Sequence, residues 1–179
     1  ILDRRSCLNR IALIERLTAA IGKPTYFLVM SNGILRKSTY LGDQYKNLTK
    51  RFLTIDLYYK LALLLDYFHD GNLYHGDLHP KNILTDGNGV EIVDWEPCPQ
   101  QIYNGIISMK CTYPYIHPKD HADRNFTKLT DYLCLISLWL GHDVETCLSI
   151  LNQWLDNNND AITAIGLATH IYNISPHHS

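Results

Sequence analysis

One short stretch of the chain places several polar side chains around a tight turn, and it constrains the fold more than any other. The chain reads His75-Gly76-Asp77-Leu78-His79-Pro80-Lys81-Asn82 and, shortly after, Asp94-Trp95-Glu96. Between them, residues 83–85 and 90–93 are short β-type runs joined by Asp86-Gly87-Asn88-Gly89. This pattern predicts a hairpin that returns Asp94 to the side of Asn82. Two aspartates and an asparagine are therefore expected in one small space.

These three side chains suit phosphoryl transfer from a nucleotide. The reaction needs a carboxylate that orients or deprotonates the attacking hydroxyl, and separate oxygen ligands that hold magnesium on the phosphates. Asp77 suits the first role, and Asn82 and Asp94 suit the second.

The spacing of Asp77 and Asn82 resembles the catalytic loop of the protein-kinase-like superfamily, in which an asparagine follows the catalytic aspartate by five positions. Gly76 replaces the family's arginine, and Asp94-Trp95-Glu96 replaces aspartate-phenylalanine-glycine. These departures are similar to aminoglycoside phosphotransferases and choline kinases. His79 stands where protein kinases usually have a lysine that touches the transferred phosphoryl group. The resemblance thus implies a catalytic hydrogen bond from His79.

Two downstream segments follow the family's order. Residues 111–119, Cys-Thr-Tyr-Pro-Tyr-Ile-His-Pro-Lys, are similar to glycine-threonine-x-x-tyrosine-x-x-proline-glutamate, which shapes the ledge for a peptide substrate. Residues 129–140 resemble the buried central helix of the C-lobe, in which an aspartate, here Asp131, caps the catalytic-loop backbone. Lys119 replaces the family's glutamate, which puts the usual ion pair of this ledge in question.

Each motif also has an ordinary interpretation. Alone, the loop fits a turn, the Asp94 triplet a strand end, and residues 133–140 a core helix. His75 and His79 have the spacing of two metal ligands on a helix, but Gly76 and Pro80 disfavour that helix. The order of loop, metal turn, ledge and buried helix favours the kinase-like interpretation.

Upstream, residues 7–21 are predicted to form a helix that Gly22 ends. Glu15 shares a face of this helix with Leu8, Ile11, Ala12 and Ala19. The resemblance implies that Glu15 pairs with the lysine that holds the nucleotide phosphates. The alternative is an ordinary surface charge.

A hairpin is predicted next, from residues 26–30 and 34–40 around Ser31-Asn32-Gly33. The adenine-binding hinge is then expected at residues 39–42, with Thr39 and Leu41 contacting the nucleotide. No glycine-rich loop is visible, and only arginines precede Glu15 as basic residues. Either the first strands and the lysine lie upstream of Ile1, or the chain is a degenerate kinase. The retention of the three site residues favours the first explanation.

The remaining helices are expected at residues 54–70, apolar nearly all round and hence buried, from about 144 to 155, and at 160–172. The fold class is therefore α+β, as one domain over residues 1–179. Residues 1–42 form a partial N-lobe and hinge, and residues 43–179 a mostly helical C-lobe. So brief a C-lobe resembles the minimal kinases that pathogenic bacteria deliver into host cells.

Composition restricts partners and compartment. A net charge of −2 without a dense basic patch argues against nucleic acid as a partner. No apolar run is long enough for a membrane span. Five cysteines without paired metal spacing suit reduced thiols in a cytoplasm, or in the host cytoplasm for a secreted bacterial effector.

The sequence therefore predicts an ATP- and Mg²⁺-dependent kinase that phosphorylates Ser or Thr of a protein substrate, because the peptide-ledge segment is present. One alternative is a small-molecule kinase of the aminoglycoside or choline type, supported by Gly76, His79 and Glu96. Another is a pseudokinase that binds a partner without catalysis, supported by the missing lysine.

Overall fold

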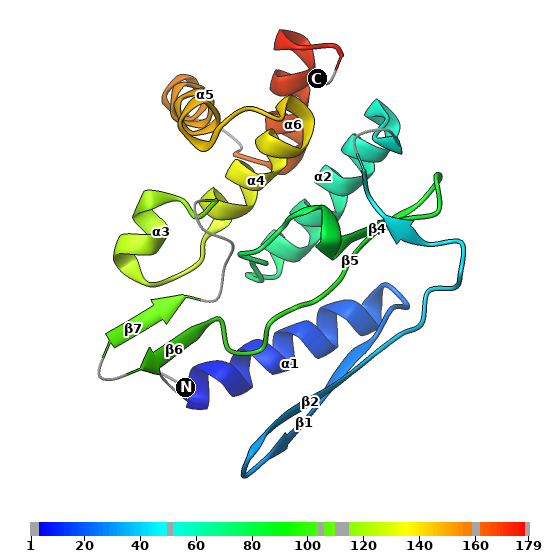
Figure 1. Cartoon of the computed structure of the whole chain (residues 1–179), viewed down its shortest axis with the longest axis vertical. Coiled ribbons are helices and arrows are strands. Elements are labelled where there is room, and N and C mark those ends of the chain that lie inside the picture. The colour runs from blue at the N-terminus through cyan, green and yellow to red at the C-terminus, as the bar shows by residue number, and fades with distance from the viewer. Residues whose placement is uncertain (1–3, 50–51, 104–105, 110–114, 159–161, 178–179) are drawn as a thin grey trace.

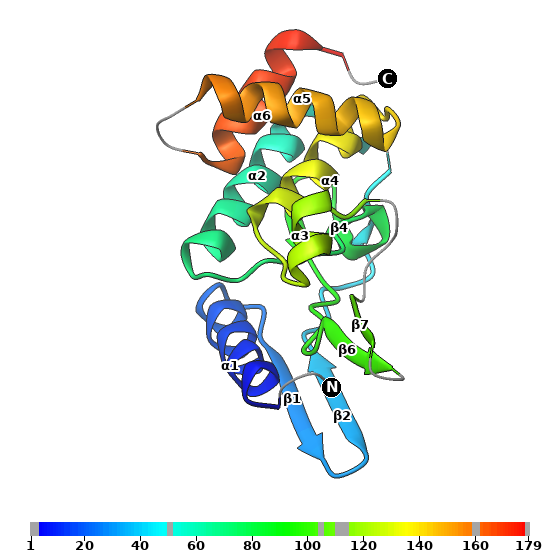
Figure 2. The same cartoon turned by 90° about the vertical axis from the view of Figure 1, so that its left-hand side faces the viewer.

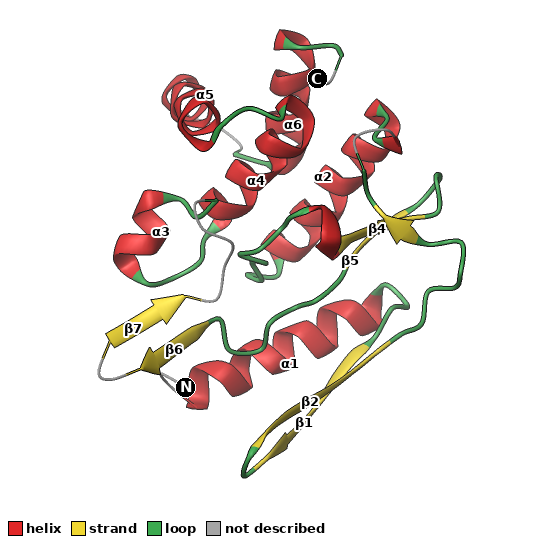
Figure 3. Ribbon diagram, viewed as in Figure 1, coloured by secondary structure: helices red, strands yellow, loops and turns green. Residues whose placement is uncertain are grey.

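The computed structural model describes residues 4–49, 52–103, 106–109, 115–158 and 162–177, which form helices and small antiparallel sheets (Figure 1). The α-helices are α1 (Arg4–Ala20), α2 (Ile55–Asp70), α3 (Pro118–Asp123), α4 (Lys128–Leu140), α5 (Val144–Asn157) and α6 (Ala164–Ile174). The strands are β1 (Thr25–Met30), β2 (Gly33–Ser38), β3 (Lys46–Asn47), β4 (Ile83–Thr85), β5 (Val90–Ile92), β6 (Gln100–Tyr103) and β7 (Ile106–Met109), and a 3₁₀ helix, η2, spans Pro80–Asn82. This mixture agrees with the predicted α+β class (Figure 3).

The helices α2, α4, α5 and α6 pack around a common apolar core at one end of the molecule (Figure 2). In α2, Tyr58 stacks on Trp139 of α4 with ring centroids 4.9 Å apart, and its hydroxyl donates to the Leu135 carbonyl at 2.7 Å. The predicted burial of α2 is confirmed for most of its apolar side chains, although Leu63 is 59% exposed. This core fixes α2 against α4, the two helices that flank the predicted catalytic loop.

The β3-β4-β5 sheet lies against α2 and confirms the hairpin predicted around residues 86–89. Ile83 pairs with Ile92, and Asp86 Oδ1 accepts hydrogen bonds from the backbone N–H groups of Asn88 and Gly89 at 2.9 and 2.6 Å. One end of this hairpin continues from the loop at residues 75–82, and the other leads to Asp94. The hairpin therefore brings the two motifs together.

Helix α1 and the β1–β2 hairpin lie side by side at the end of the molecule opposite α5 and α6 (Figure 1; Figure 2). Met30 pairs with Gly33, which confirms the turn predicted at Ser31-Asn32. Gly22, with φ of 75°, follows the last turn of α1 in a left-handed conformation that favours glycine. The predicted helix and hairpin are thus both present.

The predicted apolar face of α1 is wrong. The residues it buries are Cys7, Ile11, Ile14, Leu17 and Thr18, whereas Leu8, Ala12 and Ala19 are exposed. The buried set follows the helical spacing i, i+4, i+7 and i+11, and it is the face that packs on the rest of the molecule. Glu15 lies next to this face and is half-buried.

The last helix begins later than predicted, at Ala164 rather than near residue 160. Thr163 caps its first turn, and the Asp66 carboxylate of α2 accepts hydrogen bonds from the N–H groups of Ala164 and Ile165 at 2.6 and 3.1 Å. A cap supplied by a residue 98 positions away is not visible as a local pattern. The β6–β7 hairpin was likewise not expected from the sequence.

The expectation that all cysteines are reduced thiols is wrong for one pair. Cys7 of α1 and Cys98 form a disulfide, with Cα atoms 5.1 Å apart. Cys134 and Cys147 are free and buried, and Cys111 lies outside the described residues. Within the described chain no single helix is long and apolar enough to cross a membrane, and α4 with α5 passes that test only as a pair bent by 116°.

Reduction of this disulfide should destabilise the protein, because the bond joins residues 91 positions apart and restricts the unfolded chain. We expect a Cys7→Ser/Cys98→Ser double variant to lose about 2 to 4 kcal/mol of unfolding free energy relative to the oxidised protein. Urea denaturation with and without dithiothreitol measures the effect. Dithiothreitol should leave the stability of the double variant unchanged, and an equal response of both proteins would contradict this assignment.

Candidate active site

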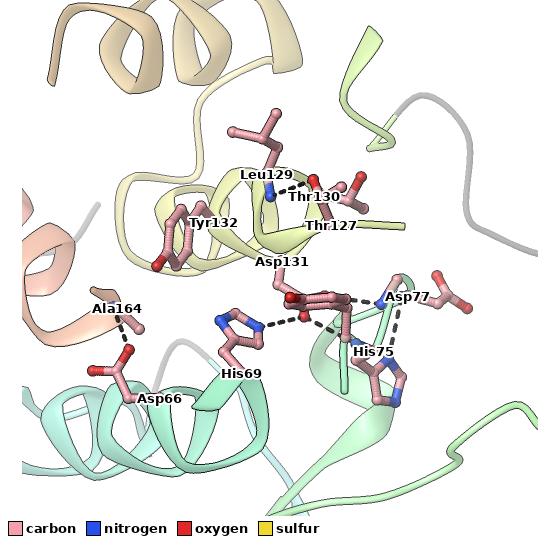
Figure 4. A network of polar contacts seen from close by, with 12 residues as sticks. Asp66, His69, His75, Asp77, Thr127, Leu129, Thr130, Asp131, Tyr132 and Ala164 are labelled. Carbon is pink, nitrogen blue, oxygen red and sulfur yellow. Dashed lines mark hydrogen bonds and ion pairs between the residues drawn. The ribbon is translucent and has the colours of Figure 1, made fainter. Parts of the chain in front are cut away.

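The loop at residues 75–82 is held by a buried carboxylate on α4 (Figure 4). Asp131 accepts hydrogen bonds from the backbone N–H groups of His75 and Gly76, both at 2.9 Å. A third bond, at 2.8 Å, comes from Nε2 of His69 in α2. Burial opposes ionisation of Asp131, but the hydrogen bonds from His69 and from the Gly76 N–H keep its pKa below the ordinary value. The predicted capping of this loop by Asp131 is confirmed.

Gly76 has a conformation and surroundings that exclude a larger residue. Its φ is +87°, in the left-handed region. A Cβ atom there would lie 2.5 Å from the ring of Phe126. The glycine that replaces the family's arginine is therefore required by the local structure, and the space of that side chain is occupied by Phe126.

His75 links the loop to the turn that carries Asp94. Its Nδ1 accepts a hydrogen bond from the Asp77 N–H at 3.2 Å, which leaves the ring proton on Nε2 to donate to the Val93 carbonyl at 2.8 Å. The ring packs against the buried Trp95, with centroids 4.7 Å apart. Both nitrogens of the neutral ring are therefore used, and the ring holds the Asp77 backbone in place.

These bonds predict a loss of stability in mild acid. Burial lowers the pKa of His75 below its ordinary value, and burial lowers that of His117 as well. The unfolded chain binds the proton first, near pH 6.5, so the stabilisation is complete above that pH and is lost as pH falls below it. We expect the urea midpoint to be lower at pH 5.5 than at pH 7.5. Equal midpoints at the two pH values would contradict the neutral, buried His75.

Asp77, His79 and Asn82 lie together on the loop and η2. The Asn82 side chain donates from Nδ2 to the Asp77 carbonyl at 2.8 Å. His79 Nε2 lies 3.3 Å from Asn82 Nδ2 and 3.5 Å from Asp77 Oδ2. Because Nδ1 accepts from the Lys81 N–H at 3.2 Å, a neutral ring carries its proton on Nε2. The side chains of Asp77 and His79 are 32% and 30% exposed. An acceptor hydroxyl can therefore reach the carboxylate, beside an N–H donor.

Asp94 follows the hairpin, and its backbone lies close to that of Asn82. The N–H of the preceding residue, Val93, donates to the Asn82 carbonyl at 2.9 Å. Its φ of 61° is unusual for a residue other than glycine. Its carboxylate Oδ1 accepts a hydrogen bond from Arg36 of β2 in an ion pair. No local pattern indicates this ion pair, because it joins residues 58 positions apart.

These residues fit a magnesium ion held jointly with phosphate groups. Because Nδ2 of Asn82 is used by the Asp77 carbonyl, the amide oxygen is the atom that can bind a metal, and Asp94 offers a carboxylate that is 51% exposed. Mg²⁺ is usually held by one or two carboxylates together with substrate phosphates and water, rather than by a complete protein cage. The described residues contain no group of three or more His, Cys, Asp or Glu side chains suited to a metal.

Arg10 of α1 is a site residue that the sequence analysis did not recognise. Its guanidinium donates to the carbonyls of Glu96 and Tyr74, both at 2.7 Å, and to that of His75 at 3.4 Å. Burial lowers the pKa of Arg10 to about 10, so the group remains charged at neutral pH. Arg10 therefore ties α1 to the loop at residues 75–82 and to the turn after Asp94. Only the three-dimensional structure reveals this, because the contacts span 64 to 86 residues.

The three residues predicted to bind the nucleotide make contacts with other segments. Glu15 accepts a hydrogen bond from the Phe27 N–H at 3.0 Å, a contact that joins α1 to β1. Thr39 bonds the Pro24 carbonyl through its hydroxyl at 2.8 Å, and Leu41 lines a small cavity with Thr39 and Val93. The role of these three residues in binding a nucleotide stays a prediction.

A second buried carboxylate, Asp120, anchors the segment that follows the predicted peptide ledge. It is fully buried and accepts hydrogen bonds from both the N–H and the hydroxyl of Thr127 and of Thr130, with lengths of 2.6 to 3.2 Å. These contacts join α3 to the start of α4. Asp120 thus anchors this region where Lys119 replaces the family's glutamate. Residues 111–114 of the ledge lie outside the described residues.

Short sequence similarities relate the chain to serine/threonine-protein kinases. It is 34% identical over 79 residues to Sgk1-B of Xenopus laevis, and 33% identical over 79 residues to Sgk1 of Rattus norvegicus and of Gallus gallus. Each match covers 42% of this chain and 18% of the relative, so the chain spans less than a fifth of the length of these curated relatives. No family model matches the sequence. The similarity supports a protein-kinase-like relationship.

Proposed function

We propose that the chain is a kinase domain that transfers the γ-phosphate of ATP to a Ser or Thr hydroxyl of a protein, within a two-lobe kinase-like arrangement. The observation that carries the proposal is the loop of Asp77 and Asn82, which Asp131 holds in place, together with the hairpin that returns the backbone before Asp94 to Asn82. The short similarity to serine/threonine-protein kinases supports the same reaction class.

In this mechanism each residue has a separate task. Asp77 accepts a hydrogen bond from the acceptor hydroxyl, orients its oxygen for attack on the γ-phosphorus and takes up its proton, while the bond from the γ-phosphorus to ADP breaks. The Nε2–H of His79 donates a hydrogen bond to the transferred group. The oxygens of Asn82 and Asp94 would hold Mg²⁺, which would supply positive charge to the phosphates of ATP.

A pseudokinase is the second candidate, and two contacts favour it. Glu15 bonds a backbone N–H of β1, and Arg36 occupies an oxygen of Asp94 that the proposed metal would use. Labelled ATP separates the candidates. The chain is incubated with [γ-³²P]ATP, Mg²⁺ and either a heat-treated protein extract, a set of aminoglycosides, or choline.

Label in protein supports the proposal, and label only in an aminoglycoside or in choline identifies a small-molecule kinase. ATP binding without any transfer identifies a pseudokinase. Asp156→Asn, an exposed change on α5, is the matched control for variants of the site aspartates.

Asp94→Asn should weaken Mg²⁺-dependent ATP binding by about tenfold or more, because it removes a charged ligand of the metal. The measurement is the Mg²⁺ concentration that gives half-maximal ATP binding. Arg36→Gln should have the opposite effect, because it removes the ion pair with the Asp94 carboxylate. We expect this variant to need less Mg²⁺ for half-maximal ATP binding. An unchanged Mg²⁺ requirement in Asp94→Asn would place the metal elsewhere.

A further inference from the structure

A cavity of about 300 Å³ opens directly beside the proposed catalytic residues. Asp77 and His79 form one of its walls. The others come from the segment before α2, with Leu48 and Leu53, from α4, with Leu138, and from Tyr115. The cavity is therefore built by elements that are distant in sequence but converge on the reacting group.

The lining of this cavity is apolar and carries little charge. Among the described residues that line it, Asp77 is the only carboxylate, and no lysine or arginine is present. Leu48, Leu53 and Leu138 are buried, with exposed fractions of 2%, 3% and 8%. An aminoglycoside carries several amines and requires several carboxylates, and a quaternary ammonium requires an aromatic cage, of which Tyr115 could supply a single wall. The chemistry of the cavity suits neither cation.

The position of the cavity determines what can occupy it during transfer. The acceptor hydroxyl must lie at Asp77, and consecutive Cα atoms of a peptide are about 3.8 Å apart. A substrate side chain that enters the cavity must therefore come from a residue close in sequence to the phosphorylated Ser or Thr. A volume of about 300 Å³ is at the lower limit for ligand pockets, and it has room for one large side chain.

We infer that this cavity selects the protein substrate by binding one bulky apolar side chain, such as Leu, Met or Phe, within two positions of the phosphorylated Ser or Thr. This inference rests on the proposed function. It specifies which substrate sequence around the phosphorylated Ser or Thr the kinase prefers. Burial of such a side chain is worth about 10- to 100-fold in kcat/KM over an alanine at the same position.

The first test is a peptide library with a fixed central Ser or Thr, in which each position from −3 to +3 is varied among Leu, Phe, Ala, Lys and Glu. We expect incorporation of label to rise about tenfold or more for Leu or Phe at one position within two of the acceptor. Labelling that is independent of these neighbours would overturn the inference and leave the proposed kinase activity intact. An absence of label from every peptide and from the protein extract would overturn both.

The second test changes the cavity itself. Ser137 lines it from α4, is only half-buried, and lies away from the proposed catalytic residues in sequence. Ser137→Phe should fill the cavity and lower kcat/KM for the apolar peptide about tenfold, with the KM for ATP unchanged. Ser137→Asp should shift the library preference towards Lys at the same position.

The matched controls are Ser149→Phe and Ser149→Asp, which alter an exposed serine on α5. They should leave kcat/KM and the library preference as in the wild type. A preference that is identical in wild type and Ser137→Asp would refute the assignment of this cavity. The library on the wild type tests the inference even if a Ser137 variant does not fold.

Discussion

Asp77→Asn should reduce turnover by roughly 10²- to 10⁴-fold, the usual contribution of a positioned general base, while ATP binding persists. The amide that replaces the carboxylate keeps the size of the side chain but cannot accept the proton of the acceptor hydroxyl. The structure explains why the loop should survive the change. Asp77 is held through its backbone, whose N–H donates to His75 and whose carbonyl accepts from Asn82.

The experiment compares initial rates of phosphate transfer and the Kd of a fluorescent ATP analogue in Asp77→Asn, Asp156→Asn and wild type. Only the first variant should lose turnover, and all three should bind the analogue with similar Kd. Wild-type turnover in Asp77→Asn would show that another group orients the hydroxyl. A parallel loss of ATP binding would indicate a structural role for the carboxylate.

Asp131→Asn should lower the free energy of unfolding by about 3 to 5 kcal/mol, the usual effect of removing one member of a buried charged network. The carboxylate is fully buried and accepts from two backbone N–H groups and from His69. An asparagine there has one oxygen and an NH₂ group, so at least one buried donor of the catalytic loop loses its acceptor.

Urea denaturation measures this effect, with the slope of free energy against urea as a check that the unfolding transition itself is unchanged. The matched control is again Asp156→Asn, which should stay within about 0.5 kcal/mol of the wild type. Turnover should fall along with stability in Asp131→Asn, because the loop that carries Asp77 loses its anchor. A variant within about 1 kcal/mol of wild type would show that the loop is held by other contacts.

The parts of the site that could be predicted are those joined by short stretches of chain. Asp77 and Asn82 lie five positions apart on one loop, and a tight hairpin with strong turn residues returns Asp94 to their side. Local geometry fixes such arrangements, because a hairpin register depends on the turn and on the alternation of its strands. Asp131 was expected only through the resemblance to a family, since nothing in its neighbouring sequence identifies its partners.

The failed predictions concern the orientation and the long-range partners of elements. The buried face of α1 was assigned incorrectly because Leu8 and Ala12 are as apolar as the residues that it buries. The start of α6 was assigned too early: Thr163 caps the helix, and the Asp66 carboxylate of α2 accepts hydrogen bonds from the N–H groups of Ala164 and Ile165, a contact that no local pattern indicates. In each case several local choices had similar free energy, and packing against another element selected one.

From the sequence alone follow the α+β class, the extent of most helices, and the hairpin that returns the chain before Asp94 to the loop of Asp77, His79 and Asn82. The tertiary structure alone decides that Arg10 holds the loop, that Arg36 meets Asp94, and that Cys7 is bonded to Cys98. It also decides that apolar residues from three segments enclose a cavity at Asp77. The physical reason is that these contacts join groups 58 to 91 residues apart, so they form only when packing of the apolar core brings those segments together.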